Sequence, residues 1–175
     1  MSTGQTILTI GAFMFLTTIL LNFYSVVAHT GDTITTGQDG ILATTIATSY
    51  MEIAQGLSFD AISDTSNIAI ANPSVLTSGL SLGREAGEDS IALYNDFDDF
   101  HRTTVDRQAM GTNRIYRTMF SVSYVNPDNL LLTTTTQTFV KRMDMKTWRI
   151  FPIAESELDI DTVRTSLVLG YFHFD

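Results

Sequence analysis

Apolar residues are distributed very unevenly along this chain, and the densest run comes first. Residues 6–28 read TILTIGAFMFLTTILLNFYSVVA and contain no charged side chain. At about 1.5 Å per helical residue, this run is long enough to cross the hydrocarbon core of a bilayer, which is about 30 Å thick. The pattern therefore predicts a membrane-spanning helix, with the remainder of the chain at a membrane surface or beyond it.

We expect this apolar run to stay in the mature protein as an anchor. A cleaved secretory signal is the alternative, because Val26 and Ala28 have the small-residue spacing of a signal-peptidase site. No basic residue precedes the run, and it is longer than the roughly 7 to 15 apolar residues of ordinary signals, which favours the retained helix. No Lys or Arg precedes Arg84, so the positive-inside rule gives no orientation.

The pattern changes after the apolar run. Residues 29–40, HTGDTITTGQDG, contain Gly31, Gly37 and Gly40, and this composition predicts a hinge or a frayed turn. Beyond it, apolar residues recur at steps of three and four, which predicts an amphipathic helix packed on a sheet. The stripe consists of Leu42, Ile46, Tyr50, Ile53 and Leu57. Asp39 is expected to cap the start of this second helix, and Gly56 to weaken its end.

Strand patterns dominate the second half of the chain. Residues 58–87 are rich in Ser, Thr, Asn and Gly and predict a long irregular region with one or two short strands. Alternation of apolar and polar residues then predicts three further strands. They are expected at about 116–124, 132–148 and 163–171, separated by a turn at 126–129 and an acidic loop at 151–161. In the second of them, Phe139, Met143 and Met145 share one face.

Strands that are close in sequence and joined by turns form an antiparallel sheet most simply. The expected fold class is therefore α+β, with an N-terminal transmembrane or long helix followed by a small antiparallel β-sheet domain. The expected parts are a leader and transmembrane helix at 1–28, a hinge and amphipathic helix at 29–57, and a β-rich extracytoplasmic domain at 58–175.

Charge and cysteine content narrow the function classes. The chain has a formal net charge of -9 and a pI near 4.5, which argues against general nucleic-acid binding and against adhesion to anionic lipid. It contains no cysteine, which removes disulfides, thiolate metal sites and cysteine nucleophiles.

The basic residues are concentrated before and within the second predicted strand. They are Arg102, Arg107, Arg114 and Arg117, followed by Lys141, Arg142, Lys146 and Arg149. We expect a solvated sheet face with ion pairs to Asp144 and its neighbours, each contributing about 0 to 1 kcal/mol. DNA capture is the alternative, but the net positive field and interleaved aromatic residues of single-strand binders are lacking.

One short segment matches the G-x-S-x-G pattern of a hydrolase nucleophile elbow. It runs from Gly79 to Gly83 with Ser81 at its centre, and His101 or His173 would have to supply the base. The elbow requires a strand before the serine and a helix after it, and the sequence predicts neither. We therefore expect a surface loop and no enzymatic activity.

The order of parts resembles the type IV pilin and pseudopilin family. Members have a short leader ending in Gly, an apolar N-terminal helix, a second amphipathic helical stretch, an acidic loop and a small antiparallel sheet. The segment ATSYMEIAQGLSFDAISD, with Glu52, Phe59 and Asp60, resembles the end of the family's long helix. YNDFDDFHRTTVD resembles its acidic, aromatic loop, and FVKRMDMKTW with DTVRTSLVLGYF resemble its closing strands.

The resemblance implies prepilin cleavage between Gly4 and Gln5 and places Thr9 where major subunits carry a Glu. In the family that Glu meets the N-terminal amine of a neighbouring subunit in the apolar filament core, where an unpaired charge is costly. The leader also lacks a Lys or Arg before its glycine, and Gln5 replaces the commoner Phe or Met. These departures indicate a minor or atypical subunit.

The function implied by the resemblance is structural: a subunit of a type IV pilus-like filament or type II secretion pseudopilus, anchored in the membrane before assembly. Its partners would be membrane lipid, other pilin-like subunits, an assembly platform and prepilin peptidase. The expected location is a bacterial inner membrane, crossed once, with the C-terminal domain periplasmic or extracellular. The alternative is a signal-anchored or secreted extracytoplasmic binding domain with no filament role.

Three carboxylates, Asp96, Asp98 and Asp99, lie close together in the acidic, aromatic segment. Their spacing lacks the glycine and distal Glu of an EF-hand. We expect a solvated acidic loop without a cofactor. Calcium binding is the alternative, because neighbouring carboxylates repel one another unless a cation intervenes, and some pseudopilins hold calcium in an acidic loop.

Overall fold

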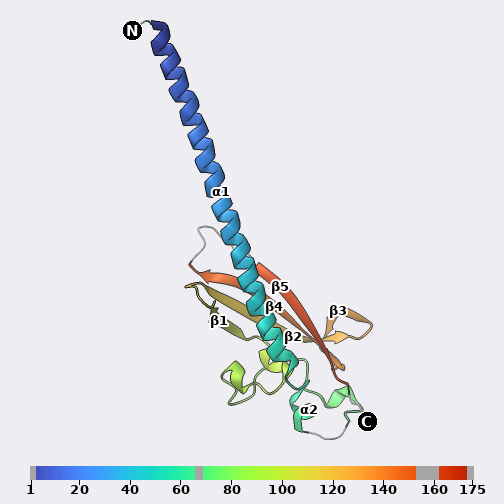
Figure 1. Cartoon of the computed structure of the whole chain (residues 1–175). Coiled ribbons are helices and arrows are strands. Elements are labelled where there is room, and N and C mark those ends of the chain that lie inside the picture. The colour runs from blue at the N-terminus through green and yellow to red at the C-terminus, as the bar shows by residue number, and fades with distance from the viewer. Residues whose placement is uncertain (1–2, 66–68, 153–161, 173–175) are drawn as a thin grey trace. The chain divides into compact units, whose positions relative to one another are not determined.

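The structure is a computed structural model, and it describes residues 3–65, 69–152 and 162–172. One long helix is followed by short helices and then by an antiparallel sheet, which confirms the α+β fold class predicted from the sequence (Figure 1). Contacts divide the chain into two compact units, Met1–Asp39 and Gly40–Asp175. Helix α1, Thr3–Gln55, contributes residues to both units.

The first unit is helical throughout its described residues. Helix α1 is long and apolar enough to cross a membrane, and no residue of its most apolar stretch is buried within the chain. A signal sequence near the N-terminus would meet the same criteria of length and composition. Threonine hydroxyls of the helix bond to carbonyls one turn back, since Thr9 Oγ1 donates to the Gln5 carbonyl and Thr17 Oγ1 to the Phe13 carbonyl, both at 2.8 Å.

The interruption predicted at residues 29–40 is wrong, because α1 continues through all three glycines without a break. A glycine costs about 1 kcal/mol relative to alanine in a helix, but extending an existing helix fixes only one residue for each added hydrogen bond. The helical segments on both sides are long enough that the helix continues through the glycine-containing stretch. Asp39 consequently lies inside α1 and does not cap a second helix. A hinge motion at these glycines stays a prediction.

The second unit is built on one five-stranded antiparallel sheet. Its strands are β1 (Thr104–Gln108), β2 (Ile115–Asn126), β3 (Asn129–Thr134), β4 (Val140–Phe151) and β5 (Thr162–Gly170). The order is β1-β2-β4-β5, and β3 pairs with the end of β2 beyond the part that β1 occupies. The register places Phe120 of β2 opposite Met145 of β4, and Met143 opposite Leu167 of β5.

The predicted strands are largely confirmed. Every second residue of β2 is buried, as expected: Tyr116, Thr118, Phe120, Val122 and Tyr124. The predicted turn at 126–129 joins β2 to β3. The single strand predicted at 132–148 is wrong, because the chain leaves the sheet at 135–139, a threonine-rich stretch without Gly or Pro to signal the break. Most of the acidic loop predicted at 151–161 lies outside the described residues.

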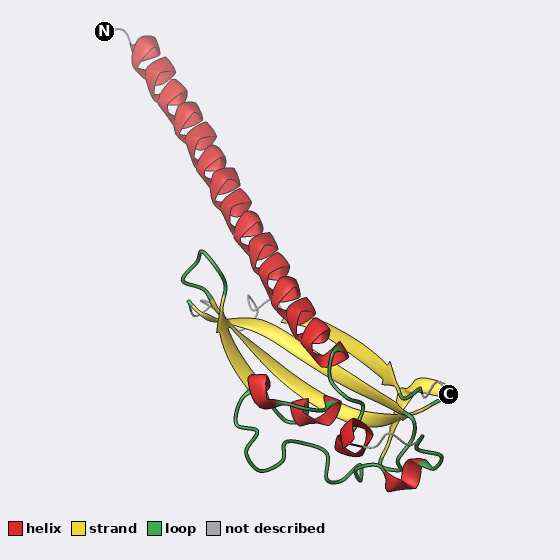
Figure 2. Cartoon of the chain, turned by 60° about the horizontal axis from the view of Figure 1, so that its bottom comes forward, coloured by secondary structure: helices red, strands yellow, loops and turns green. Residues whose placement is uncertain are grey.

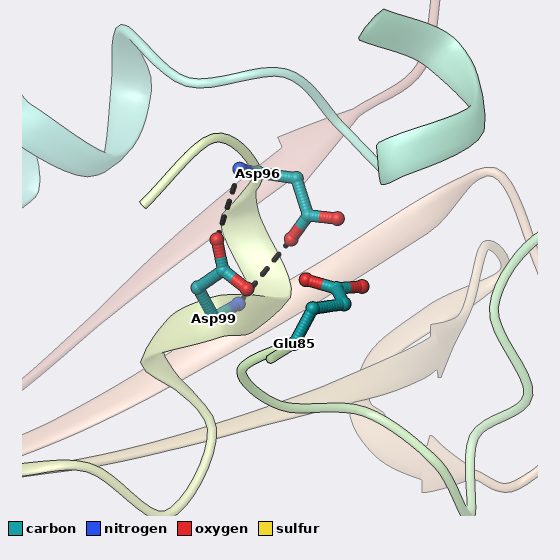
Figure 3. Close-up of side chains that lie close together, drawn as sticks. All are labelled: Glu85, Asp96 and Asp99. Carbon is teal, nitrogen blue, oxygen red and sulfur yellow. Dashed lines mark hydrogen bonds between the residues drawn. The ribbon is translucent and has the colours of Figure 1, made fainter. Parts of the chain in front are cut away.

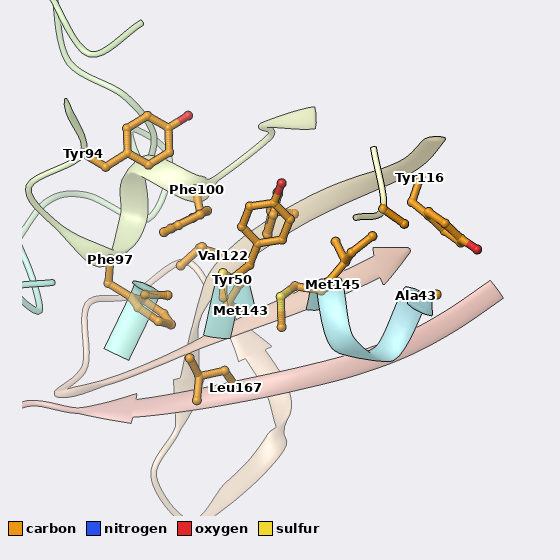
Figure 4. Close-up of a cluster of buried hydrophobic side chains, with 14 residues drawn as sticks. Ala43, Tyr50, Tyr94, Phe97, Phe100, Tyr116, Val122, Met143, Met145 and Leu167 are labelled. Atoms are coloured by element: carbon orange, nitrogen blue, oxygen red, sulfur yellow. The ribbon is translucent and has the colours of Figure 1, made fainter. Parts of the chain in front are cut away.

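The core lies between the last turns of α1 and one face of the sheet (Figure 4). Tyr50 of α1 contacts Phe120 edge to face, with ring centroids 5.2 Å apart. The predicted stripe is confirmed at Ile46 and Tyr50, whereas Ile53 is 39% exposed. The remaining buried apolar positions of the helix are alanines: Ala43, Ala47 and Ala54. Small side chains at these positions let the helix backbone approach the sheet closely.

Short helices and turns connect α1 to β1 and gather along one side of the sheet (Figure 2). They are α2 (Ala61–Thr65) and three 3-10 helices, η1 (Pro73–Val75), η2 (Ile91–Leu93) and η3 (Phe97–Phe100). The described part of 58–87 contains no strand, contrary to expectation, and only Ser58 forms an isolated bridge, to Asp96. The Phe97 N–H donates to the Ser58 carbonyl at 2.9 Å, which fixes η3 beside the end of α1.

Candidate functional site

Buried charged residues gather where η3 meets the start of β4. Asp60, Asp96, Asp98, Asp99 and Lys141 all have 0% exposure. The solvated acidic loop expected from the sequence is therefore wrong. Because a buried charge costs several kcal/mol unless it is paired, each of these side chains requires a partner.

Lys141 is the positive centre of this region. Its side chain points inward because β4 alternates, so that Lys141 shares the buried face with Met143 and Met145. The ammonium donates to the Phe59 carbonyl at 2.7 Å, to Asp60 Oδ2 at 2.9 Å and to Asp98 Oδ1. All three N–H groups of the ammonium are thus used.

The two carboxylates that hold Lys141 are themselves fixed by the connecting segment. Thr77 donates to Asp60 twice, from its N–H to Oδ2 at 3.0 Å and from its hydroxyl to Oδ1 at 3.1 Å. The Tyr124 hydroxyl donates to the Thr77 carbonyl at 2.8 Å, and burial raises the pKa of Tyr124, so this hydroxyl keeps its proton. Asp98 Oδ2 accepts from the Gly83 N–H at 3.5 Å.

Asp96 and Asp99 form a capping box around η3. Asp96 Oδ1 accepts from the N–H groups of Asp98 and Asp99 at 2.9 and 3.3 Å. Asp99 Oδ2 accepts from the N–H groups of Asn95 and Asp96 at 3.0 and 3.2 Å. These bonds use one oxygen of each carboxylate. The second oxygens, Asp96 Oδ2 and Asp99 Oδ1, are buried without a hydrogen-bond partner.

Glu85 completes a cluster of three carboxylates with Asp96 and Asp99 (Figure 3). One oxygen from each residue lies within 4.8 Å of the other two. Glu88 holds the loop that carries Glu85, because its Oε2 accepts from the Glu85 N–H at 2.8 Å and its Oε1 from Asn95 Nδ2 at 2.6 Å. We call Glu85, Asp96 and Asp99 the carboxylate cluster.

Desolvation and mutual repulsion raise the pKa values of the three residues in the carboxylate cluster. Burial, with the negative charges of Asp98 and Asp99, raises the pKa of Asp96 to about 8. Glu85 is exposed, but partial desolvation of its carboxyl group and a hydrogen bond with Glu88 raise its pKa to about 7. Burial also raises the pKa of Asp99. The cluster can therefore hold protons up to neutral pH, and a cation that binds its oxygens has to displace them.

The G-x-S-x-G segment is a surface loop, as expected. Residues 77–90 form turns and bends, and Ser81 is exposed. The glycines have backbone reasons: a side chain on Gly79 would come within 2.5 Å of the Thr135 carbonyl oxygen, and Gly83 has a φ of 130°. His101 Nδ1 accepts from the Val122 N–H at 3.1 Å, and His173 lies outside the described residues.

The basic residues do not all lie on one face of the sheet, because Lys141 is buried. Arg142 pairs with Asp144 at 2.9 Å and Arg117 with Asp106 at 2.7 Å, which confirms the expected ion pairs on the sheet face. The prediction that Lys141 lies on this solvated face is wrong, because its position in β4 directs its side chain into the core. The candidate processing residues Gly4, Gln5 and Thr9 lie in α1 and are exposed.

Sequence analysis missed three members of this region: Asp60, Glu85 and Lys141. The burial of Lys141 could have been predicted from the sequence. Lys141 is two residues before Met143 and four before Met145, so in a strand it lies on the same face as these two buried side chains. Glu85 and Asp60 lie far from the aspartates in sequence, and the turns that bring them back have no periodic pattern.

Replacing Lys141 by Met should destabilise the second unit by about 3 to 5 kcal/mol, because Asp60 and Asp98 would stay buried without their cation. Urea unfolding of the full chain in detergent, followed by circular dichroism, measures the loss. Lys146→Met is the matched control, since Lys146 is exposed on the same strand. Equal effects of the two substitutions would contradict the role given to Lys141.

Stability in the presence of a chelator should fall as pH rises from 6.5 to 8. A carboxyl whose pKa is higher in the folded than in the unfolded chain binds its proton more tightly when folded, so its stabilising contribution is lost as pH rises toward the folded value. For Asp96 that value is about 8, against 3.8 ordinarily, so we expect a loss of about 1 kcal/mol per pH unit. His101 adds little in this window, because burial lowers its pKa below 6.5.

Urea unfolding at several pH values measures this slope. Asp96→Asn should reduce the slope to the part that Glu85 and Asp99 contribute, because their pKa values are also raised. Asp89→Asn, a substitution at an exposed position near the same loop, should leave the slope unchanged. A stability that stays constant or increases across the window would refute the assignment.

No protein-family model matches this chain, and no curated protein or solved structure matches it either. The likeness to type IV pilins therefore rests on the segments quoted from the sequence, and membership of that family stays a prediction.

Proposed function

We propose that this chain is a subunit of a type IV pilus-like or type II secretion-like filament, held in a bacterial inner membrane before assembly. The observation that carries the proposal is the continuity of α1. Its first part is an exposed apolar helix, and its last part, from Gly40 onward, belongs to the core of the sheet domain. One helix thus provides both the anchor and the packing surface for the sheet.

The apolar part of α1 needs a non-aqueous neighbour. Phe13, Met14 and Phe15 are exposed by 64%, 68% and 69%. Successive residues of a helix point roughly 100° apart, so these side chains surround the helix and do not form a single stripe. A helix that is apolar on all sides is stable in lipid or inside a bundle of helices. Membrane lipid before assembly and the helices of other subunits afterwards would supply these two environments.

The polar residues of the helix support a minor or atypical subunit. Thr9 Oγ1 donates to the Gln5 carbonyl at 2.8 Å, so it needs no partner outside the helix. A Glu at this position would require a cation from a neighbouring subunit, whereas Thr9 does not. Cleavage by prepilin peptidase between Gly4 and Gln5, extraction by an assembly platform and a periplasmic or extracellular sheet domain belong to the same proposal.

A signal-anchored or secreted binding domain is the second candidate. Val26 and Ala28 have the spacing of a signal-peptidase site, and an N-terminal signal has the same apolar character as the first part of α1. In this case the sheet domain would act by itself outside the cytoplasm, and the helix would serve export alone.

The first residue of the mature protein separates the candidates. Mass spectrometry of the protein isolated from its native source should find Gln5 at the N-terminus, because a filament subunit retains its apolar helix after leader removal. A start at His29 would refute the filament proposal in favour of secretion, and an intact Met1 would indicate a plain anchor.

A charge within the apolar helix should abolish membrane retention and assembly. Leu16→Arg places a guanidinium near the centre of the apolar run, at a cost of about 3 kcal/mol in lipid. Thr48→Arg is the control, because Thr48 is exposed on the part of α1 that belongs to the second unit. Membrane fractionation and recovery of the subunit in sheared filaments measure both steps. Normal assembly of Leu16→Arg would contradict the proposal.

A further inference from the structure

We infer that the carboxylate cluster is a binding site for one calcium ion, which joins the Glu85 loop to η3. This inference concerns the sheet domain and is independent of the filament proposal. The inferred ligands differ in one residue from those expected from the sequence: Asp98 pairs with Lys141, and Glu85 joins Asp96 and Asp99 in its place.

The first support is the pair of buried oxygens without partners. Asp96 and Asp99 have 0% exposure, and each leaves one carboxylate oxygen without a hydrogen bond. Leaving a buried polar atom unsatisfied costs about 1 to 3 kcal/mol, and more when it is charged. Both residues belong to the carboxylate cluster, together with Glu85.

The second support is the spacing of the oxygens. Calcium binds oxygen at about 2.3 to 2.6 Å, so two ligands on opposite sides of the ion lie roughly 5 Å apart. The three carboxylate oxygens lie within 4.8 Å of one another, so a single ion can reach all of them. Exposure of Glu85 leaves room for water to complete the six to eight ligands, roughly, that calcium takes.

The third support is the charge of the surroundings. The ammonium of Lys141 forms its ion pairs with Asp60 and Asp98, and it only partly offsets the burial and the neighbouring charges that raise the pKa of Asp96. Two positive charges placed among three carboxylates would remove most of their repulsion. Oxygen ligands without nitrogen or sulfur suit calcium or magnesium better than zinc. The larger calcium ion tolerates irregular geometry, whereas magnesium demands a regular octahedron with shorter bonds.

Calcium binding would have a structural consequence. Glu85 is the only member of the carboxylate cluster outside the segment that forms η3. An ion held by all three residues would therefore fix the loop of Glu85 and Glu88 against the capping box. Binding to the folded chain alone stabilises it by mass action, so calcium should raise the temperature of unfolding.

The experiment is thermal unfolding of the full chain in non-ionic detergent at pH 7.5, after removal of metals with a chelator. Adding calcium chloride to about 10⁻³ M should raise Tm by about 5 °C, and magnesium should raise it less. Glu85→Gln and Asp96→Asn should each reduce the calcium shift by half or more. Asp89→Asn, which changes an exposed carboxylate outside the cluster, should keep the full shift.

Glu85→Gln decides the result if Asp96→Asn does not fold, because Glu85 is exposed and its side chain is not needed for the capping box. A wild-type chain whose Tm does not respond to calcium would overturn the inference. The carboxyl groups of the cluster would then be neutralised by protonation and not by a metal ion. A calcium shift of full size in Glu85→Gln would overturn it as well, because the ion would then bind elsewhere.

Discussion

The buried ammonium of Lys141 is the interaction on which the sheet domain depends. It holds Asp60 from the segment after α1 and Asp98 from η3 against the start of β4. Those two segments have little regular structure of their own, so this charge adds to the Phe97–Ser58 hydrogen bond and the buried aromatic rings of η3 in holding them against the sheet. Because two carboxylates share one cation, negative charge remains in the region, and this remaining charge contributes to the high pKa of Asp96.

The two parts of α1 follow different physical rules although they form one helix. Large apolar side chains cover the first part on all sides, which suits an environment that is apolar all around the helix, such as lipid or a helix bundle. The second part has one narrow buried face of Ala43, Ala47 and Ala54 with Ile46 and Tyr50. Alanines contribute little area each, but they bring the backbone close to the sheet, where Tyr50 reaches Phe120.

Sequence alone predicted the strands better than the connections between them. Alternation from Tyr116 to Tyr124 identified the buried face of β2, because side-chain direction in a strand depends only on parity. The break between β3 and β4 went undetected, since threonines favour strands and no turn residue marks residues 135–139. The unbroken α1 was missed for the opposite reason: local glycine content was weighed above the cooperativity of a long helix.

The candidate site was predicted in part. Asp96, Asp98 and Asp99 were identified from composition, but their burial depends on contacts with Lys141 and with the Ser58 backbone, which no local pattern encodes. Separation of Asp98 from the other two aspartates likewise depends on the direction of each side chain in η3. Such assignments require tertiary structure, because neighbouring residues of one turn face different partners.

The burial of Lys141 also has a practical consequence for chemical labelling. The chain contains two lysines, Lys141 and Lys146, and they face opposite sides of β4. Amine-reactive reagents reach Lys146 in the folded domain, whereas Lys141 is fully enclosed and acquires a label only when β4 separates from η3. The ratio of modification at these two positions is therefore an internal gauge of how often the domain opens.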